Sequence, residues 1–290
     1  MKKAQLELKT DAILGEGSIW NAETQELYWI DIEGKKLHIY DPATRKNRTL
    51  DLPTRIGTVV PAGKDRALIG LEDGVYAIDT RTGEISRFAA IEADRPGNRL
   101  NDGKCDPAGR LWIGTMSLEE EEGAGTLYRV DPDGAVSPQI RNVTISNGIV
   151  WTSDHRTMYY IDTPTGQVRA YDFDLASGSI SNERVAVEID ESEGFPDGMT
   201  IDAEDMIWVA LWKGSAVARF DPRSGKLLEK IEVPALKVPS CAFGGPELDT
   251  LYITTASIDM SPEQQTQFPD AGSLFSVKPG VKGVGSPFFG

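Results

Sequence analysis

Histidine and cysteine are nearly missing from this chain of 290 residues, which has two of each. His38 lies in an alternating apolar segment and His155 in a polar turn, so neither occupies the repeated position described below. A Ser-His-Asp or Cys-His relay, which needs a histidine beside its nucleophile, is therefore disfavoured. Cys105 and Cys241 are too few for a disulfide framework, and we expect them to be buried thiols in a reducing compartment.

The chain also has little positive charge, no long apolar run and no phosphate-binding loop. Its 45 acidic and 30 basic residues leave a net charge of −15, so nucleic acid or an anionic membrane surface would meet like charge. The first residues lack the apolar stretch of a signal peptide, and no run approaches a membrane span. No glycine-rich loop precedes a helix, which disfavours nucleotide chemistry. We expect a cytoplasmic protein without nucleic-acid, membrane or obligate protein partners.

What the chain has instead is a repeated pattern. In residues 195–210 an acidic residue and a glycine open a short apolar segment, and an acidic turn leads to a second apolar segment. The residues that begin the second segment of each copy are 39 to 49 positions apart: Tyr28, Ala67, Trp112, Tyr159, Trp208 and Tyr252. A repeat of this length, with about four short strands in each unit, is typical of propeller blades. These six copies predict an all-β fold, a six-bladed β-propeller that forms a single domain over residues 1–290.

Two further features of the predicted propeller concern its ends and its loops. Residues 1–14 alternate between polar and apolar side chains, and we expect them to form a strand that pairs with the last blade and closes the ring. Insertions at 117–125 and 257–272 lengthen the loops between second and third strands of blades 3 and 6. Because turns alternate between the two faces, both loops should lie where the first strands begin, and could form a lid.

One position of the repeat carries oxygen-bearing side chains in four blades. It lies 11 or 12 residues before the start of the second segment and holds Glu16, Asn101, Asn147 and Asp197. Equal positions in different blades converge on one end of the central channel. Oxygen ligands without histidine or cysteine favour one divalent cation, Ca²⁺ first, with Mg²⁺, Mn²⁺, Zn²⁺ or Fe²⁺ as alternatives. Any one of these residues could be a simple turn residue, but four at one position favour a shared site. Blade 6 has only Ser240 there, and blade 2 has Ile56.

Two other charged residues are candidates for contact with a substrate. Arg99 lies two positions before Asn101 and would be the nearest fixed positive charge at the channel mouth. It suits a carboxylate or hydroxyl oxygens, and the alternative is a salt bridge to the acidic lid. Glu119 begins a run of four glutamates on the predicted lid and is a candidate for hydroxyl recognition, whereas the alternative is a solvated loop.

Several motifs in combination resemble one known family over nearly the whole chain. They are Leu14–Trp20, Arg99–Arg110, Gly114–Met116, Ser146–Gly148, Phe195–Met199 and Cys241–Gly245. They resemble the SMP-30/gluconolactonase/LRE-like family of regucalcin-like sugar lactonases. The resemblance implies a six-bladed propeller with one divalent cation at the channel end. It further implies Glu16, Asn147 and Asp197 as cation ligands, Asp197 also as general base, and Arg99, Asn101 and Glu119 as substrate contacts.

These observations lead to the hypothesis of a metal-dependent hydrolase that opens a small sugar lactone. Glucono-, xylono-, galactono- and arabinonolactone are examples of such aldonolactones. A cation at this position would polarise the lactone carbonyl while water held near Asp197 attacks it. Two alternatives remain open at this point: phosphotriester hydrolysis with the same cation, and a calcium-binding or protein-interaction propeller without enzymatic activity.

Overall fold

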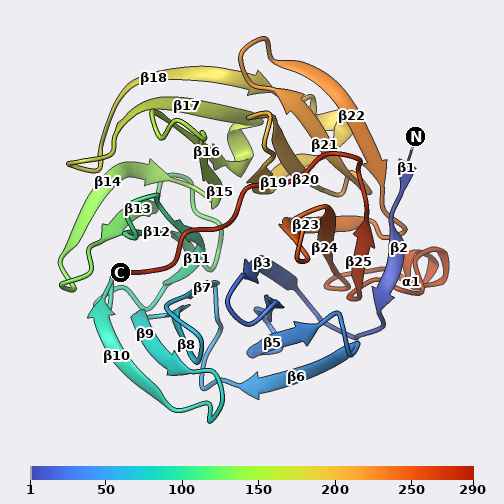
Figure 1. Ribbon diagram of the computed structural model, residues 1–290, viewed down its shortest axis with the longest axis horizontal. Helices are drawn as coiled ribbons and strands as arrows, with labels where there is room; N and C mark the ends of the chain where they lie inside the picture. The colour runs from blue at the N-terminus through green and yellow to red at the C-terminus, as the bar shows by residue number, and fades with distance from the viewer. Residues whose placement is uncertain (1) are drawn as a thin grey trace.

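Six antiparallel sheets stand around a central channel in the computed structural model, which describes residues 2–290 (Figure 1). Four blades consist of four consecutive strands; blade 5 gains a fifth strand and blade 6 its outermost strand from the N-terminal segment. The first strand of each blade lies nearest the channel. The predicted six-bladed β-propeller is therefore confirmed. Met1 lies outside the described residues, so the expected N-terminal strand can be followed only from residue 2.

The first three blades follow one another along the chain with short turns between their strands. Blade 1 has β3 (Gly15–Asn21), β4 (Glu26–Asp31), β5 (Lys36–Asp41) and β6 (Lys46–Asp51); blade 2 has β7 (Thr58–Pro61), β8 (Arg66–Leu71), β9 (Gly74–Asp79) and β10 (Ile85–Ala90); blade 3 has β11 (Asn98–Cys105), β12 (Leu111–Ser117), β13 (Gly125–Val130) and β14 (Val136–Val143).

The last three blades repeat this order and include the few helical turns. Blade 4 has β15 (Ser146–Trp151), β16 (Thr157–Asp162), η1 (Thr163–Thr165), β17 (Gln167–Asp174) and β18 (Ser179–Glu188); blade 5 follows η2 (Glu191–Glu193) and has β19 (Phe195–Ile201), β20 (Ile207–Trp212), β21 (Ala216–Asp221) and β22 (Lys226–Glu232); blade 6 has β23 (Lys237–Gly244), β24 (Thr250–Ala256), α1 (Pro262–Gln267) and β25 (Leu274–Val277).

The N-terminal segment closes the ring in two steps. β2 (Gln5–Leu8) pairs antiparallel with β25 and supplies the outer strand of blade 6, as predicted. β1 (Lys2–Lys3) continues to blade 5, where it pairs in parallel with β22, and this second contact was not predicted. Both outer edges are thereby covered by strands from the other end of the chain, which removes an open sheet edge at the seam.

The C-terminal strap, residues 278–290, crosses the ring at the end where first strands turn into second strands (Figure 1). Gly283 N–H donates to Leu248 O (2.8 Å), and Ala203 N–H donates to Lys282 O (2.8 Å), so the strap touches blades 6 and 5. Farther along, the N–H groups of Phe289 and Gly290 donate to carbonyls of blades 2 and 3 at 2.9 and 3.0 Å. The strap therefore links four blades at the channel end opposite the predicted site.

Apolar side chains fill the space between neighbouring blades rather than one central core. Trp112, for example, packs edge-on against Trp151 of the next blade, with ring centroids 6.0 Å apart.

Cys105 and Cys241 are free and buried, as expected. Within residues 2–290 no helix combines the length and apolarity needed to cross a membrane.

Candidate active site

A register shift interrupts the first strand of five blades close to the repeated position. The shifts lie between Glu16 and Ile19, Leu100 and Gly103, Asn147 and Ile149, Pro196 and Met199, and Lys237 and Ser240. Such a bulge adds a residue to one strand and re-aims a side chain. The four oxygen-bearing residues predicted from the repeat, Glu16, Asn101, Asn147 and Asp197, all lie at or within these shifts. Blade 2 pairs β7 with β8 without such a shift.

Glycines beside the bulges let neighbouring first strands approach closely. A Cβ added at Gly148 would lie 2.7 Å from the carbonyl oxygen of Asp197, and one at Gly198 would lie 2.7 Å from that of Pro239. Larger residues at these two positions would force the strands apart. The glycine after the oxygen-bearing residue thus holds the ring narrow enough for side chains of several blades to meet.

A cavity of about 120 Å³ occupies this end of the channel. Five of the six predicted site residues line it: Glu16, Arg99, Asn101, Asn147 and Asp197. All five are at least nine-tenths buried. The remaining walls are mostly apolar and consist of Leu14, Ile32, Met116, Glu120, Ile145, Thr163 and Trp212.

A chain of hydrogen bonds fixes the two asparagines in this cavity. Arg99 Nη1 donates to Asn101 Oδ1 (2.5 Å), while Asn101 Nδ2 donates to Ser146 O (2.7 Å) and to Asn147 Oδ1 (3.2 Å). Asn147 Nδ2 in turn donates to Thr163 Oγ1 (2.8 Å). Because its amide nitrogen is held by Thr163, Asn147 presents its oxygen to Asn101, which lines the same cavity.

Two carboxylates in the cavity have few partners. Glu16 Oε2 accepts the N–H of Gly17 (3.0 Å), and Asp197 Oδ1 is buried without a hydrogen-bond partner among residues 2–290. Burial and, second, the charge of Asp102 raise the pKa of Glu16 to about 8. Burial raises the pKa of Asp197 well above its usual range, and the charges of Glu16 and Asp102 add to this effect.

This donor set fits a hard divalent cation. A buried carboxylate oxygen without a partner costs free energy, and a bound cation removes that cost. Glu16, Asn147 and Asp197 offer two carboxylates and one amide oxygen, the ligands that Ca²⁺ and Mg²⁺ take. No group of three or more His, Cys, Asp or Glu side chains in the described part of the chain is placed to hold a metal, so the amide oxygen is an essential member of this set.

The structure places Glu120, rather than Glu119, against the cavity. Both glutamates are exposed, but only Glu120, which adopts a positive φ of 54°, lines the cavity. Glu120 also shares a second hollow with Asp259 and Gln264, so the two inserted loops lie on the same face, as the expected lid requires. The backbone conformation that brings Glu120 and not Glu119 to the cavity has no recognisable sequence pattern.

Three other residues of the site were missed by the sequence analysis. Asp102 is 8% exposed, and its negative charge raises the pKa values of Glu16 and Asp197. In the sequence Asn101-Asp102-Gly103 it looks like an ordinary turn residue. Thr163 links Asn147 to the carbonyl of Pro196 (2.8 Å). Trp212 ends β20 and completes the apolar wall. The position of Asp102 directly after a candidate site residue was the only available signal.

Comparison with known proteins identifies the family. The model of the SMP-30/gluconolactonase/LRE-like region matches residues 14–257. A Bacillus subtilis protein, provisionally named a sugar lactone lactonase, is 42% identical, with 95% of this chain and 94% of that protein covered. Human regucalcin is 37% identical over 97% of this chain and 96% of its own. The crystal structure of regucalcin from Agrobacterium tumefaciens, described as calcium-binding, superposes with a TM-score of 0.95 at 31% identity over 100% and 98% of the two chains. The chain belongs to the SMP-30/gluconolactonase/LRE-like family.

Proposed function

We propose that the protein is a hydrolase that opens sugar lactones to aldonic acids with the help of one divalent cation. The observation that carries the proposal is Asp197 Oδ1, a buried carboxylate oxygen without a partner at a cavity that also contains Arg99 and Asn101. The name of the Bacillus subtilis relative supports the substrate class, and the description of the Agrobacterium relative supports a cation.

Glu16, Asn147 and Asp197 would hold the cation, with Ca²⁺ favoured. When bound, such a cation polarises a carbonyl and stabilises negative charge on its oxygen. Asp197 would orient the attacking water through a hydrogen bond, accept its proton as the new C–O bond forms, and return a proton to the ring oxygen as the lactone bond breaks. Asn101 keeps Asn147 in place through the hydrogen bond between their amides.

Arg99 is suited to bind the hydroxyl or carbonyl oxygens of the substrate. Only its Nη1 donates within residues 2–290, to Asn101 and to the carbonyl of Leu100 (3.1 Å). The remaining N–H groups of its planar guanidinium are available to a ligand, and this fork pairs well with oxygen atoms. Because Arg99 is buried and tied to Asn101, little conformational entropy is lost when it binds.

The apolar wall contributes by limiting what enters the cavity. Ile32, Met116 and Trp212 surround the polar residues and reduce their contact with water, which strengthens electrostatic interactions inside. A volume of about 120 Å³ is small compared with drug-sized pockets of roughly 300–1,000 Å³. The cavity therefore suits the reacting ring of a small lactone.

A pH-indicator assay with a panel of aldonolactones and an aryl phosphotriester tests the proposal. The protein is first freed of metal and then given Ca²⁺, Mg²⁺, Mn²⁺, Zn²⁺ or Fe²⁺ in turn. We expect kcat/KM on five- or six-membered aldonolactones to exceed that on the phosphotriester, and hydrolysis to require a cation. A preference for the phosphotriester would reject sugar lactones as substrates. Cation binding without any hydrolysis would instead support the non-enzymatic calcium-binding alternative.

A further inference from the structure

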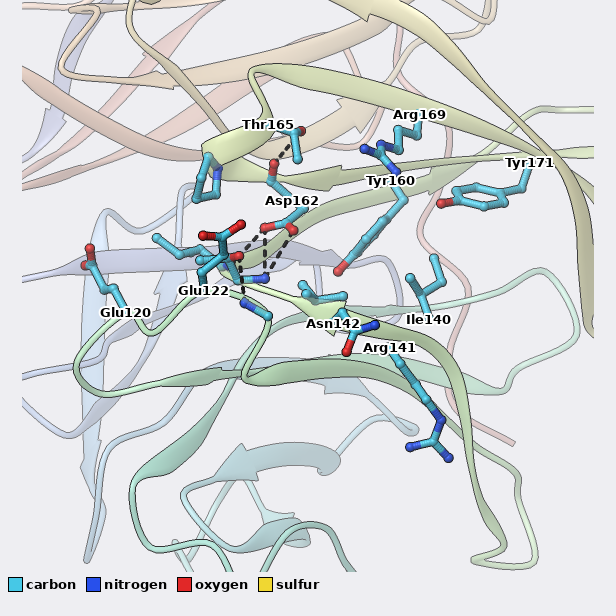
Figure 2. Close-up of a pocket in the computed structure, with 15 residues that line it drawn as sticks. Glu120, Glu122, Ile140, Arg141, Asn142, Tyr160, Asp162, Thr165, Arg169 and Tyr171 are labelled. Atoms are coloured by element: carbon cyan, nitrogen blue, oxygen red, sulfur yellow. Dashed lines mark hydrogen bonds between the residues drawn. The ribbon is translucent and has the colours of Figure 1, made fainter.

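A second, larger cavity of about 760 Å³ lies between blades 3 and 4 (Figure 2). Its walls come from β14 and the segment that follows it, from β16 and β17, from η1, and from the inserted loop of blade 3. We call it the outer cavity. Its volume falls within the range of roughly 300–1,000 Å³ that is typical of ligand sites.

The outer cavity adjoins the central one. Glu120 of the inserted loop and Ile145 line both, so these two residues border the two spaces. Tyr160, on the buried wall of the outer cavity, donates its hydroxyl to Ser146 Oγ (2.7 Å), and the carbonyl of the same serine accepts a hydrogen bond from Asn101 (2.7 Å). A ligand too large for the central cavity therefore has a neighbouring space into which it can extend.

The polar groups of the outer cavity fall into two sets. Asp162 already has hydrogen-bond partners within the protein, because its carboxylate accepts hydrogen bonds from the backbone N–H groups of Thr144 and Ile145 at 2.9–3.2 Å. By contrast, the side chains of Glu122 and Asn142 form no hydrogen bond within residues 2–290, and the same holds for Glu120 and Arg141. These groups are available to a ligand.

Arg169 is a further polar group of the outer cavity and comes from the opposite wall. Its Nη1 pairs with Glu183, but its buried Nε has no partner in the part of the chain that the structure describes. Figure 2 shows Arg169 and Glu122 on opposite sides, with Tyr160 and Asn142 in view between them. Arg141 extends away from the other labelled side chains.

The chemistry of these walls selects for a neutral, hydroxyl-rich ligand. An anion would face Glu120 and Glu122, and a cation would face Arg169. An apolar ligand would cover unpaired polar groups, which costs free energy. A sugar has both donors and acceptors on every side, and it also places C–H faces that suit the apolar parts of Tyr160 and Tyr171.

We propose that the outer cavity binds the glycosyl group of a glycosylated aldonolactone whose lactone ring occupies the central cavity. This inference rests on the proposed function and extends it from single-ring lactones to the lactones of oxidised disaccharides. Glu120 then lies at the junction of the two rings, because it borders both spaces.

The experiment compares glucono-δ-lactone with cellobiono-δ-lactone, which carries a glucosyl group on the same ring. We expect wild-type protein to hydrolyse the glycosylated lactone with the higher kcat/KM, mainly through a lower KM. Arg169→Gln should reduce the ratio of the two kcat/KM values about tenfold, the effect of one hydrogen bond to a charged group. Asn142→Gly should also reduce it, and glycine tolerates the positive φ of 58° at this position.

Arg184→Gln is the matched control. Arg184 also belongs to blade 4 and also pairs with one acidic residue, Asp172 (2.8 Å), but it does not line the outer cavity. The proposal is overturned if cellobiono-δ-lactone has no advantage over glucono-δ-lactone, or if Arg184→Gln lowers the ratio as much as Arg169→Gln does.

Calorimetric binding of cellobionate and gluconate separates this inference from the proposed function. If neither lactone is hydrolysed with any cation, the proposed function fails, and calorimetry alone decides about the outer cavity. Tighter binding of cellobionate that weakens in Arg169→Gln but not in Arg184→Gln would support the glycosyl site. Equal binding of the two acids, or equal loss in both variants, would overturn it.

Discussion

Asp197 and Asp202 are buried aspartates, the first near the start of β19 and the second directly after its last residue, yet their surroundings differ completely. Asp202 is 0% exposed and accepts hydrogen bonds from Trp208 Nε1 (2.9 Å) and Arg219 Nε (2.7 Å), as well as from two backbone N–H groups. Asp197 is 6% exposed, and its Oδ1 has no partner among residues 2–290. Burial alone therefore says little about the role of a carboxylate, whereas the number of its partners does.

The same contrast recurs in blade 3. Asp106 follows β11 and accepts from Arg110 Nε (2.6 Å) and Trp112 Nε1 (2.9 Å), as Asp202 does in blade 5. Asn101, in the first half of the same strand, lines the cavity instead. Each of these two blades thus stabilises its fold at one end of the first strand and exposes polar groups to a ligand at the other.

Removing the paired aspartate should have the largest effect on stability. Asp202→Ala leaves the guanidinium of Arg219 and the indole N–H of Trp208 without their shared acceptor. We expect the free energy of unfolding to fall by about 3–5 kcal/mol, the usual cost of breaking a buried ion pair from one side. Urea denaturation monitored by tryptophan fluorescence measures it. A loss below about 1 kcal/mol would show that the two aspartates do not differ as described.

Removing the charge of the unpaired aspartate should affect catalysis instead. Asp197→Asn keeps the size and one coordinating oxygen, so we expect weakened but measurable cation binding and a loss of at least ~10²-fold in kcat. The unfolding free energy of the cation-free protein should not fall, because the substitution removes a buried ionisable carboxyl group whose Oδ1 has no partner among residues 2–290. Steady-state kinetics and urea denaturation of the same sample measure both quantities.

Asn147→Ala is the control for that experiment, because Asn147 is a candidate ligand without a proton to exchange. Its activity should recover in part when the cation concentration is raised, whereas that of Asp197→Asn should not. Equal recovery of both variants at saturating cation would mean that Asp197 is a ligand only. Glu16 would then be the next candidate for the base.

The pH dependence of stability should sharpen the comparison further. Without a cation, the folded protein keeps a proton on Glu16 up to a pKa of about 8, while the unfolded chain releases it near 4.5. The cation-free protein therefore loses stability as the pH rises from about 4.5 to 8. Ca²⁺ displaces this proton, so the gain in Tm on adding Ca²⁺ should grow over that interval, by at least roughly 2 °C.

Thermal scans with and without Ca²⁺ at several pH values measure this gain, and Glu16→Gln is the control. That variant cannot release the proton, so it should show a flatter dependence on pH. A gain in Tm that decreases as the pH rises would contradict the assignment of the buried carboxylates to the cation.

The smallest expected effect separates two neighbouring glutamates of the inserted loop. Glu120→Gln should raise KM for a lactone about threefold, because Glu120 borders the cavity and a surface contact is worth less than about 1 kcal/mol. Glu119→Gln should change KM less, and neither variant should change cation affinity much. Titration with Ca²⁺ checks the last point, and a larger effect of Glu119→Gln on KM would favour the residue predicted from the sequence.

The propeller and most of the cavity were predictable because both depend on periodicity. The apolar residues that start each second strand recur at nearly even spacing, and residues at one position of a repeat meet at the axis. Asp102 was not predictable in the same way, because a bulge turns it inward beside Asn101. Nothing in the sequence indicates that Glu120, with its positive φ, borders the cavity and Glu119 does not. The pairing of β1 with β22 joins segments with no common pattern.

The closure of blade 6 by β2 has a consequence for the synthesis of the protein. Gln5–Leu8 leave the ribosome long before their partner strand Leu274–Val277, which lies far along the chain. At a translation rate of about 5–20 residues per second, the N-terminal segment waits roughly 10–50 s for this partner. During that time the ring of blades 1 to 5 is incomplete, so ring closure is a late event in folding.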